Sequence, residues 1–496
     1  MVASLPQVGP PRDTEMLIVN GIDGATGAYL VPPMALSSLC ERIQGDSVLR
    51  PGIRGRIRRL LAQFTEAHLG LPATVDPTDY RQAGWGVVYH NATPDAVKRA
   101  VQPLLEHRRR QVQNDELVRE LEYRDGESWS LWLSRNGAGP GSVRPKKVPY
   151  YLLVVGPPDR IPFVFTSQLG MEYSVGRLHF EREADYDTYV RSLIDYETAA
   201  SVPNDKAAVF FGTRHSQQDA TRLSADHLVT PLADGRTEEE GGDGEPGVAA
   251  AAGYKSQSFT GPAATRARLL QLLTPGPGAR PPALLFTATH GMGWPKGDTQ
   301  QRAAQGALLC QDWPGAGTIA PEHYLQATDV PEEASVHGLL AFHFACYSAG
   351  TPAEDRYIHA ADQAPPAIAD AAFIAALPQR LLSHGKGGAL AIVGHVERAW
   401  GFSIMAPGGD PEILPFENAL HFMLRGVPVG HAMRDFSQKY ATVGNYLAGL
   451  LERARYDRGI RPGELANAWV QRNDAEGYLI LGDPAARLRV DLLHAN

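Results

Sequence analysis

The sequence predicts an α/β fold built on a mostly parallel β-sheet that is flanked by helices. After a turn-rich stretch at residues 136–147, apolar runs of strand length alternate with amphipathic segments of helix length, which is the pattern of parallel strands joined by covering helices. The chain has 496 residues, of which 43% are hydrophobic and 21% are charged, so it can bury a large core and is not disordered. Its 50 glycines and 38 prolines indicate many loops between short elements.

Strands and helices are expected in alternation beyond the turn-rich stretch. Each strand is an apolar run between turn signals, at residues 150–155, 207–211, 284–288, 339–344 and 389–393. The helices, in which apolar residues recur at helical spacing, are expected at residues 185–199, 218–229, 263–273, 371–382, 416–424 and 429–453. Residues 234–253 are acidic, rich in glycine and without apolar periodicity, and are predicted to form a mobile surface loop.

The part of the chain before the turn-rich stretch shows fewer clear elements. Residues 16–20 form a short apolar run that ends in a turn, and residues 54–68 carry helical spacing. A second helix is expected at residues 94–113, with Thr93 as N-cap and Pro94 at the first helical position. Its three arginines at residues 108–110 suit the surface of a helix C-terminus better than a nucleic-acid site.

Composition excludes several classes of protein. Lys and Arg number 47 against 55 Asp and Glu, a net charge of −8, so no bias toward nucleic acid appears. The chain has neither a secretory signal pattern at its start nor an apolar run long enough for a membrane span, so we expect a cytoplasmic protein without a membrane partner. Its three cysteines are too few and too far apart for a disulfide framework or a zinc site. The glycines of residues 19–27 and 385–388 match neither dinucleotide nor phosphate-loop patterns, so no cofactor or metal is expected.

Two strand ends carry side chains capable of covalent chemistry. In PPALLFTATHGMG, His290 and Gly291 directly follow a buried strand, and in GLLAFHFACYSAG, Cys346 follows another buried strand into a turn of small residues. The carboxyl ends of parallel strands meet at one edge of a sheet, where active sites gather. A cysteine nucleophile needs an imidazole to take its proton and N–H donors to face the oxyanion. We therefore predict a dyad of His290 and Cys346.

Other cysteines and histidines have structural explanations. Buried cysteine behaves as a small hydrophobic residue, and we assign Cys40 and Cys310 this role. His337 precedes a strand and His384 lies in a turn, so neither follows a strand as His290 does. His395 ends a strand, where it either lines the cleft or is a structural histidine, and we expect the second.

Further segments surround the two strand ends in a fixed order. Upstream lie YYLLVVGPPDRIPF, EYSVGRLHF and IDYE, and downstream lie GGALAIVGHVERAWG and YLILGDPAARL. With THG after one strand and AC after the next, this order resembles the caspase-like (clan CD) cysteine peptidases. The flanks are most similar to the gingipain-type group, with the bacterial CHAT proteases as relatives. The resemblance covers residues 148–490.

The resemblance implies a caspase-hemoglobinase-like sheet and a cysteine endopeptidase that acts on a protein substrate through a thioester acyl-enzyme. His290 would be the general acid and base, Cys346 the nucleophile, and the backbone amides of Gly291 and Cys346 the oxyanion hole. Residues 201–496 would form the catalytic domain, and residues 146–200 the gingipain-like segment before it. Residues 1–145 match no family that we recognise and are expected to form an α-rich or α/β module of unknown role, a candidate site for a regulatory partner protein.

Substrate preference is open at this stage. In arginine-specific gingipains an aspartate in the loop before the first catalytic-domain helix pairs with a basic P1 side chain, and Asp219 lies at a similar place, which favours cleavage after Arg or Lys. Asp219 could equally cap the positive end of its own helix. Arg214 in the same loop would instead favour an acidic P1 residue. Arg236, in the acidic loop, is a candidate P1 residue for self-cleavage.

The sequence also departs from the gingipains. They present a third carboxylate near the catalytic histidine, but no acidic residue lies between Phe211 and Asp219. The group that orients His290 is therefore unassigned, with a backbone carbonyl or a water as candidates. The missing acid favours the alternative function, a caspase-like scaffold or regulatory binding protein without catalytic activity.

Overall fold

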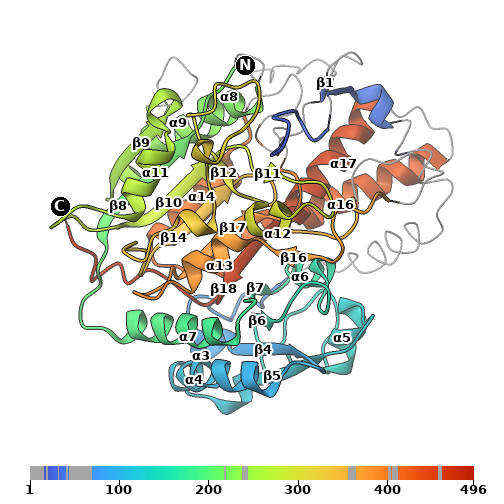
Figure 1. Cartoon of the computed structure of the whole chain (residues 1–496). Coiled ribbons are helices and arrows are strands. Elements are labelled where there is room, and N and C mark those ends of the chain that lie inside the picture. Colours follow the sequence, from blue (N-terminus) through green and yellow to red (C-terminus); the bar gives the residue numbers. More distant parts are fainter. Residues whose placement is uncertain are drawn as a thin grey trace, which may run out of the picture.

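The computed structural model describes residues 16–17, 21–31, 33–40, 43, 70–216, 219–236, 244–355, 365–399, 404, 411–455 and 461–495. Its core is a ten-stranded sheet with the strand order β5-β4-β6-β7-β18-β17-β14-β10-β8-β9 (Figure 1). In chain order, the strands are β4 (Trp85–His90), β5 (Val118–Tyr123), β6 (Tyr151–Val155), β7 (Ser174–Leu178), β8 (Asp205–Gly212), β9 (Lys255–Thr260), β10 (Pro282–Ala288), β14 (Leu340–Phe344), β17 (Ala391–His395) and β18 (Tyr478–Gly482). The predicted α/β class with a mostly parallel sheet is confirmed.

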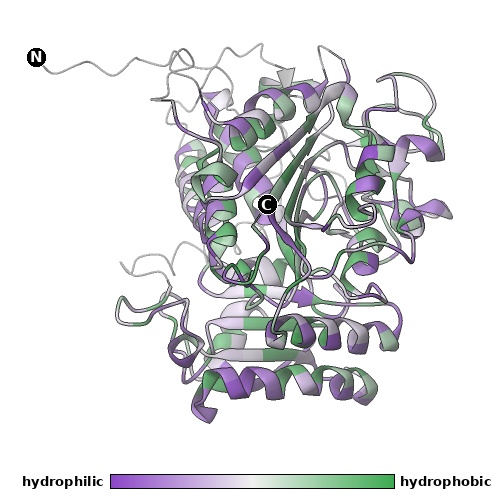
Figure 2. Ribbon diagram, turned by 90° about the vertical axis from the view of Figure 1, so that its left-hand side faces the viewer, coloured by the Kyte–Doolittle hydropathy of each residue, from purple (hydrophilic) through white to green (hydrophobic). Residues whose placement is uncertain are grey.

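The sheet consists of two parallel halves that run in opposite directions. All neighbouring strands pair parallel except β17 and β18, which pair antiparallel. The carboxyl ends of β8, β10, β14 and β17 therefore lie at one edge of the sheet. Every residue of β6, β10, β14 and β17 is buried, as expected for parallel strands that are covered on both faces. Figure 2 shows helices on both sides of the strands.

The helices overlap the predicted ones but differ from them in length and in their ends. The principal ones are α4 (Asp95–Val112), α7 (Glu183–Thr198), α11 (Arg266–Leu273), α13 (Ala376–Leu382), α14 (Leu414–Leu424), α16 (Arg434–Arg455) and α17 (Pro462–Gly477). The helix expected at 429–453 is divided by a break after Ala432, and α17 was not predicted. Thr93 was wrongly predicted as an N-cap, because Pro94 itself is the cap residue of α4 and no side chain bonds to the first turn. Helix α13 begins five residues later than predicted because β16 (Phe373–Ile374) pairs with β15 (Gly350–Thr351).

Two further segments differ from the prediction. The helix expected at 218–229 is split into α8 (Ala220–Ser224), a π-helical turn at Ala225–Val229 and α9 (Thr230–Asp234). Within the acidic segment 234–253, a short helix α10 (Val248–Ala251) forms. The helix expected at 54–68 and most of the run at 16–20 lie outside the described residues.

Residues assigned to a separate N-terminal module contribute to the same sheet. Strand β4 pairs with β5 on one side and with β6 on the other, so the sheet continues across the predicted boundary at 145. This part of the chain, which holds α4 and α5 (Trp129–Arg135) as well, is α/β in its described residues. No helix in the described part of the chain is both long and apolar enough to cross a membrane.

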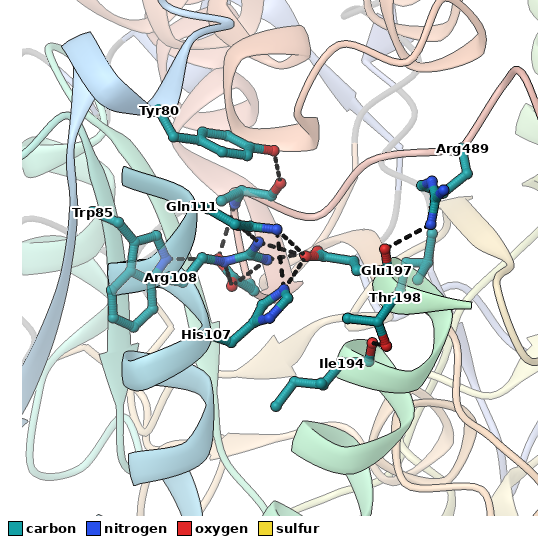
Figure 3. A network of polar contacts seen from close by, with 12 residues as sticks. Tyr80, Trp85, His107, Arg108, Gln111, Ile194, Glu197, Thr198 and Arg489 are labelled. Carbon is teal, nitrogen blue, oxygen red and sulfur yellow. Dashed lines mark hydrogen bonds and ion pairs between the residues drawn. The ribbon is translucent and has the colours of Figure 1, made fainter. Parts of the chain in front are cut away.

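A buried polar network ties the first half of the sheet together (Figure 3). Arg108 of α4 is fully buried and forms ion pairs with Glu197 of α7 at 2.7 Å and with Asp483, just after β18, at 2.8 Å. The indole N–H of Trp85 donates to the same Asp483 carboxylate at 3.0 Å. The prediction of a surface arginine at this position was wrong, because two carboxylates from other elements meet Arg108 in the core.

Candidate active site

The pairing of β10 with β14 places His290 and Cys346 at the same level, beyond the carboxyl ends of these two strands. The β10–β14 ladder ends with Ala288 opposite Phe344, and the two residues of interest each lie two positions further along. Gly291 comes next, and a Cβ at this position would lie 1.8 Å from the carbonyl oxygen of Cys346 and 2.5 Å from its nitrogen. Only glycine allows the two backbones to approach this closely. The backbones of Gly291 and Cys346 are thus in close contact, and His290 and Cys346 lie on neighbouring strand ends.

The start of helix α8, in the segment that follows strand β8, supplies a carboxylate to His290. Both oxygens of Asp219 accept from the imidazole Nε2, at 2.9 and 3.0 Å. Asp219 is also the N-cap of α8, since its carboxylate accepts from the backbone N–H of Thr221 at 2.8 Å. The alternative that Asp219 caps its helix is confirmed, but the carboxylate also contacts the histidine, which the sequence did not predict.

The protonation pattern of His290 follows from this contact. Because a carboxylate only accepts hydrogen bonds, the proton of the neutral ring lies on Nε2, and Nδ1 carries a free lone pair. Nδ1 is buried and has no hydrogen-bond partner among the described residues. One ring nitrogen is therefore held by the carboxylate, and the other has a lone pair that no described group occupies.

The Asp219 carboxylate stays ionised next to this ring. Burial by itself would raise its pKa, but the hydrogen bonds from His290 and Thr221, and the positive charge that His290 carries when it is protonated, outweigh burial and hold the pKa below its usual value. Tyr29 adds another bond, because its hydroxyl donates to Asp219 Oδ2 at 2.8 Å. Asp219 is 8% exposed, and both of its carboxylate oxygens accept hydrogen bonds.

A second imidazole lies against the first. The rings of His215 and His290 are stacked, with centroids 5.9 Å apart and planes 11° from parallel. His215 contacts the carbonyl of Trp313 through Nδ1 at 3.1 Å. Burial, with a smaller effect of the His290 charge, lowers the pKa of His215 to about 4, so it is neutral at pH 7. His215 thus restricts rotation of the His290 ring without adding charge.

The sulfur of Cys346 faces backbone amides. The N–H of Ala399, just beyond β17, donates to Sγ at 3.2 Å. Burial raises the pKa of the thiol to about 12, although the Ala399 and Gly291 amides and the nearby charge of Arg398 act in the opposite direction. The thiol is accordingly protonated in the arrangement seen here, and both it and the His290 ring are fully buried.

Two residues with positive φ shape the backbone beside the sulfur. Tyr347 has φ 58° and Glu397 has φ 70°, in the left-handed region that side chains other than glycine rarely adopt. They are joined, since the N–H of Tyr347 donates to the carbonyl of Glu397 at 2.6 Å. Such strain is held at functional sites by surrounding structure, here by the turns that follow β14 and β17.

The other predicted site residues lie apart from the sulfur or are engaged elsewhere. Arg214 forms an ion pair with Asp226, and Arg236 forms one with Glu417 of α14. The S1 prediction for Asp219 and Arg214 and the self-cleavage prediction for Arg236 stay predictions. The competing histidines contact backbone carbonyls: His337 that of Ser192, His384 that of Pro331 and His395 that of Asp474. Cys310 is buried, which raises its pKa, and Cys40 is buried in a separate small core.

Sequence reasoning missed Ala399, Tyr29 and His215. Ala399 lies a few residues after a strand that had been predicted, so the same rule of strand ends could have indicated it. His215 follows Arg214 in the loop that holds the S1 candidates, and only its stacking on His290 in the structure distinguishes it. No cluster of three or more metal-binding side chains occurs among the described residues.

Comparisons with known proteins add little to this geometry. No family model matches the chain, and no curated protein matches it. One solved structure, described as "Structure of Protease", is similar with a TM-score of 0.40 and 13% sequence identity, over 82% of this chain and 78% of that one. A likeness of this size defines neither a family nor an activity.

Proposed function

We propose that the protein is a cysteine peptidase in which Cys346 is the nucleophile, His290 the general base and acid, and Asp219 the carboxylate that orients His290. One observation carries the proposal. The segments that follow three adjacent strands, β8, β10 and β14, bring a carboxylate, an imidazole and a thiol to one end of the sheet, with the carboxylate bonded to one imidazole nitrogen and the other nitrogen without a partner among the described residues. This arrangement supports the roles of nucleophile, base and orienting group.

The reaction follows from these roles. His290 Nδ1 takes the thiol proton, and the Cys346 thiolate attacks the scissile carbonyl carbon to form a C–S bond. The negative charge that develops on the carbonyl oxygen is met by the Gly291 amide, with the Cys346 amide as the second predicted donor. The C–N bond then breaks as His290 gives its proton to the leaving amine. Water, deprotonated by His290, hydrolyses the thioester, which releases the carboxylic acid and restores the thiol.

A peptide substrate is supported by the backbone that follows the histidine. Strand β11 (Met292–Gly293) begins two residues after His290 and offers an edge that takes an extended strand, since residues Ile22–Asp23 (β2) pair with it in parallel. Extended peptides bind proteins by adding a strand to such an edge. The edge is thus suited to hold a polypeptide next to Cys346.

The position of Asp219 changes the proposed basis of specificity. Its carboxylate already accepts from His290, Thr221 and Tyr29. A basic P1 side chain would have to displace one of these donors. We therefore propose that Asp219 acts on the histidine rather than in an S1 pocket, and we draw no P1 preference from it.

The proposed function is tested with Cys346→Ala. Cleavage of a denatured protein mixture, followed by mass spectrometry of the new N-termini, is expected from the purified protein and is expected to disappear in the variant. Cys310→Ala, which removes another buried thiol, is the matched control and should retain cleavage. Equal cleavage by the Cys346→Ala variant would contradict the proposal.

The scaffold alternative has one observation in its favour. Cys346 and His290 are both fully buried, and the pKa of the thiol is about 12, whereas reactive cysteines have lowered pKa values and some exposure. A thiol-reactive peptide probe separates the two functions. A peptidase should be labelled at Cys346 before Cys40 and Cys310, and a scaffold should not.

A further inference from the structure

Residues 21–31 lie directly over the proposed catalytic groups. A Cβ on Gly21 would stand 3.2 Å from the sulfur of Cys346, so the Gly21 backbone is in contact with the nucleophile. The Tyr29 ring meets the His290 ring edge to face, with centroids 5.6 Å apart. The Tyr29 hydroxyl donates to Asp219 and accepts from the Ala220 N–H at 3.2 Å. One short segment therefore touches each of the three groups that the reaction needs.

The segment is a folded hairpin. Ile22 and Tyr29 form an antiparallel bridge, and the N–H of Asp23 donates to the Ala28 carbonyl at 2.8 Å. The Asp23 carboxylate closes the turn by accepting from the backbone N–H groups of Ala25 and Thr26, as Asp commonly does in turns. In Figure 1 this dark blue segment lies beside β11.

The hairpin packs closely against the residues that surround it. Ile22 is 1% exposed and belongs to a small apolar core with Met292, Trp294 and Trp313. A Cβ on Gly24 would lie 2.4 Å from the Trp294 ring, and one on Gly27 would lie 2.2 Å from the Gly317 carbonyl oxygen. Such close approaches require glycine at both positions.

The hairpin pairs with β11, the strand that we propose binds the peptide substrate, and so prevents a peptide from binding there. The N–H of Gly24 donates to the Gly293 carbonyl at 2.8 Å, which uses a hydrogen-bonding group that an extended peptide would need. The Gly21 carbonyl accepts from the Leu30 N–H at 3.0 Å, so this carbonyl is bonded within the hairpin.

We propose that residues 21–31 are a built-in cover that blocks the Cys346–His290 pair, and that the site becomes accessible only when the hairpin leaves β11 and the Asp219–Tyr29 contact breaks. In the unaltered protein this opening is transient, so cleavage and labelling at Cys346 are slow, and both are expected to become faster when the cover is weakened. Regulation of proteolysis by this cover rests on the proposed function, but the covering of the thiol does not. The cover also accounts for the full burial of Cys346 and, through that burial, for the raised pKa of its thiol.

The test measures alkylation of Cys346 by iodoacetamide in the full-length protein, with each cysteine followed separately by peptide mass spectrometry. Two variants weaken the cover: Tyr29→Phe removes the hydroxyl that bonds to Asp219, and Gly24→Leu forces the hairpin away from Trp294. We expect alkylation of Cys346 to rise by about tenfold or more in each, as loss of a buried hydrogen bond or a close contact predicts. Gly276→Leu, at an exposed glycine with no atom within 4 Å of its Cβ, is the control and should leave the rate unchanged.

Cys310 distinguishes opening of the cover from loss of the fold. Unfolding would expose Cys310 together with Cys346, whereas departure of the hairpin exposes Cys346 alone. A Cys346 rate that is the same in the unaltered protein and both variants, or a rise that Cys310 shares equally, would overturn the proposal. If alkylation rises as expected but no peptide is cleaved, the cover stands and the proposed peptidase function fails.

Discussion

At the scale of single residues, Asp219 has the largest consequence for function. Its carboxylate contacts His290, caps α8 and receives the Tyr29 hydroxyl. In the sequence, an aspartate at this place suggested an S1 pocket for a basic side chain. A carboxylate that can bind a guanidinium group can equally bind an imidazole, so the residue type alone does not identify its partner. Which partner it meets depends on where β10 brings His290, and that is a property of the fold.

We expect Asp219→Asn to lower kcat/KM by about 100-fold to 10,000-fold, because an amide does not stabilise the protonated imidazole and permits the wrong tautomer. The loss should be similar for peptides with Arg, Lys, Asp or Leu at P1. Asp226→Asn, which alters the partner of Arg214 on a neighbouring turn, is the control. Loss confined to basic P1 residues would show instead that Asp219 lies in S1.

At the scale of elements, the sequence predicted what depends on local pattern. The strands β6, β8, β10, β14 and β17 are buried apolar runs, and the signal for each is contained in five to eight residues. Strand β2 is only two residues long, and its partner β11 lies far away in the chain. No local periodicity can indicate such a pair. The hairpin over the active site was therefore not predictable, although the two residues that it covers were.

Other elements were missed for the same physical reason. Strand β4, in WGVVYH, is as apolar as its neighbours, but its place in the same sheet follows only from pairing with β6. The late start of α13 follows from the pairing of β15 with β16. His215, which no motif identifies, gains its role from stacking on a ring that lies far along the chain. Each of these features depends on a contact between residues that lie far apart in the sequence.

The junction of β10 and β14 gives an element-scale prediction. In Gly291→Ala, the new methyl group would collide with the Cys346 backbone, and the strand ends would have to separate. Overpacking of this kind costs about 1–3 kcal/mol of unfolding free energy, and displacement of catalytic groups by about 1 Å lowers turnover by about 100-fold.

Activity assays and denaturant unfolding measure the two effects of Gly291→Ala. Gly139→Ala is the control, since no atom lies within 4 Å of a Cβ at that position. Full activity in Gly291→Ala would show that close contact between the Gly291 and Cys346 backbones is not needed.

At the scale of the whole molecule, the two halves of the sheet form one structure through the antiparallel pair β17 and β18. Strand β18 comes last in the chain but lies in the middle of the sheet, between β7 and β17. Residues before 145 and residues after 478 are therefore joined in one sheet. The Arg108 network strengthens this junction, because it links α4, α7 and the turn after β18.

Arg108→Ala should destabilise the whole protein, because it leaves the Glu197 and Asp483 carboxylates buried without their cation. Removing one partner of a buried pair costs about 3–5 kcal/mol. Arg109→Ala, next to it on α4, removes only an exposed pair with Asp115 and should cost less than about 1 kcal/mol.

The same network makes stability depend on pH. Burial would raise the pKa of Glu197, but Arg108 and His107 lower it to about 2. This contribution to stability is thus complete above pH ~4.5 and is lost as the pH falls toward 2. Urea unfolding at pH 7 and pH 3 measures both effects, and equal midpoints for the two variants at pH 7 would show that the network does not hold the halves of the sheet together.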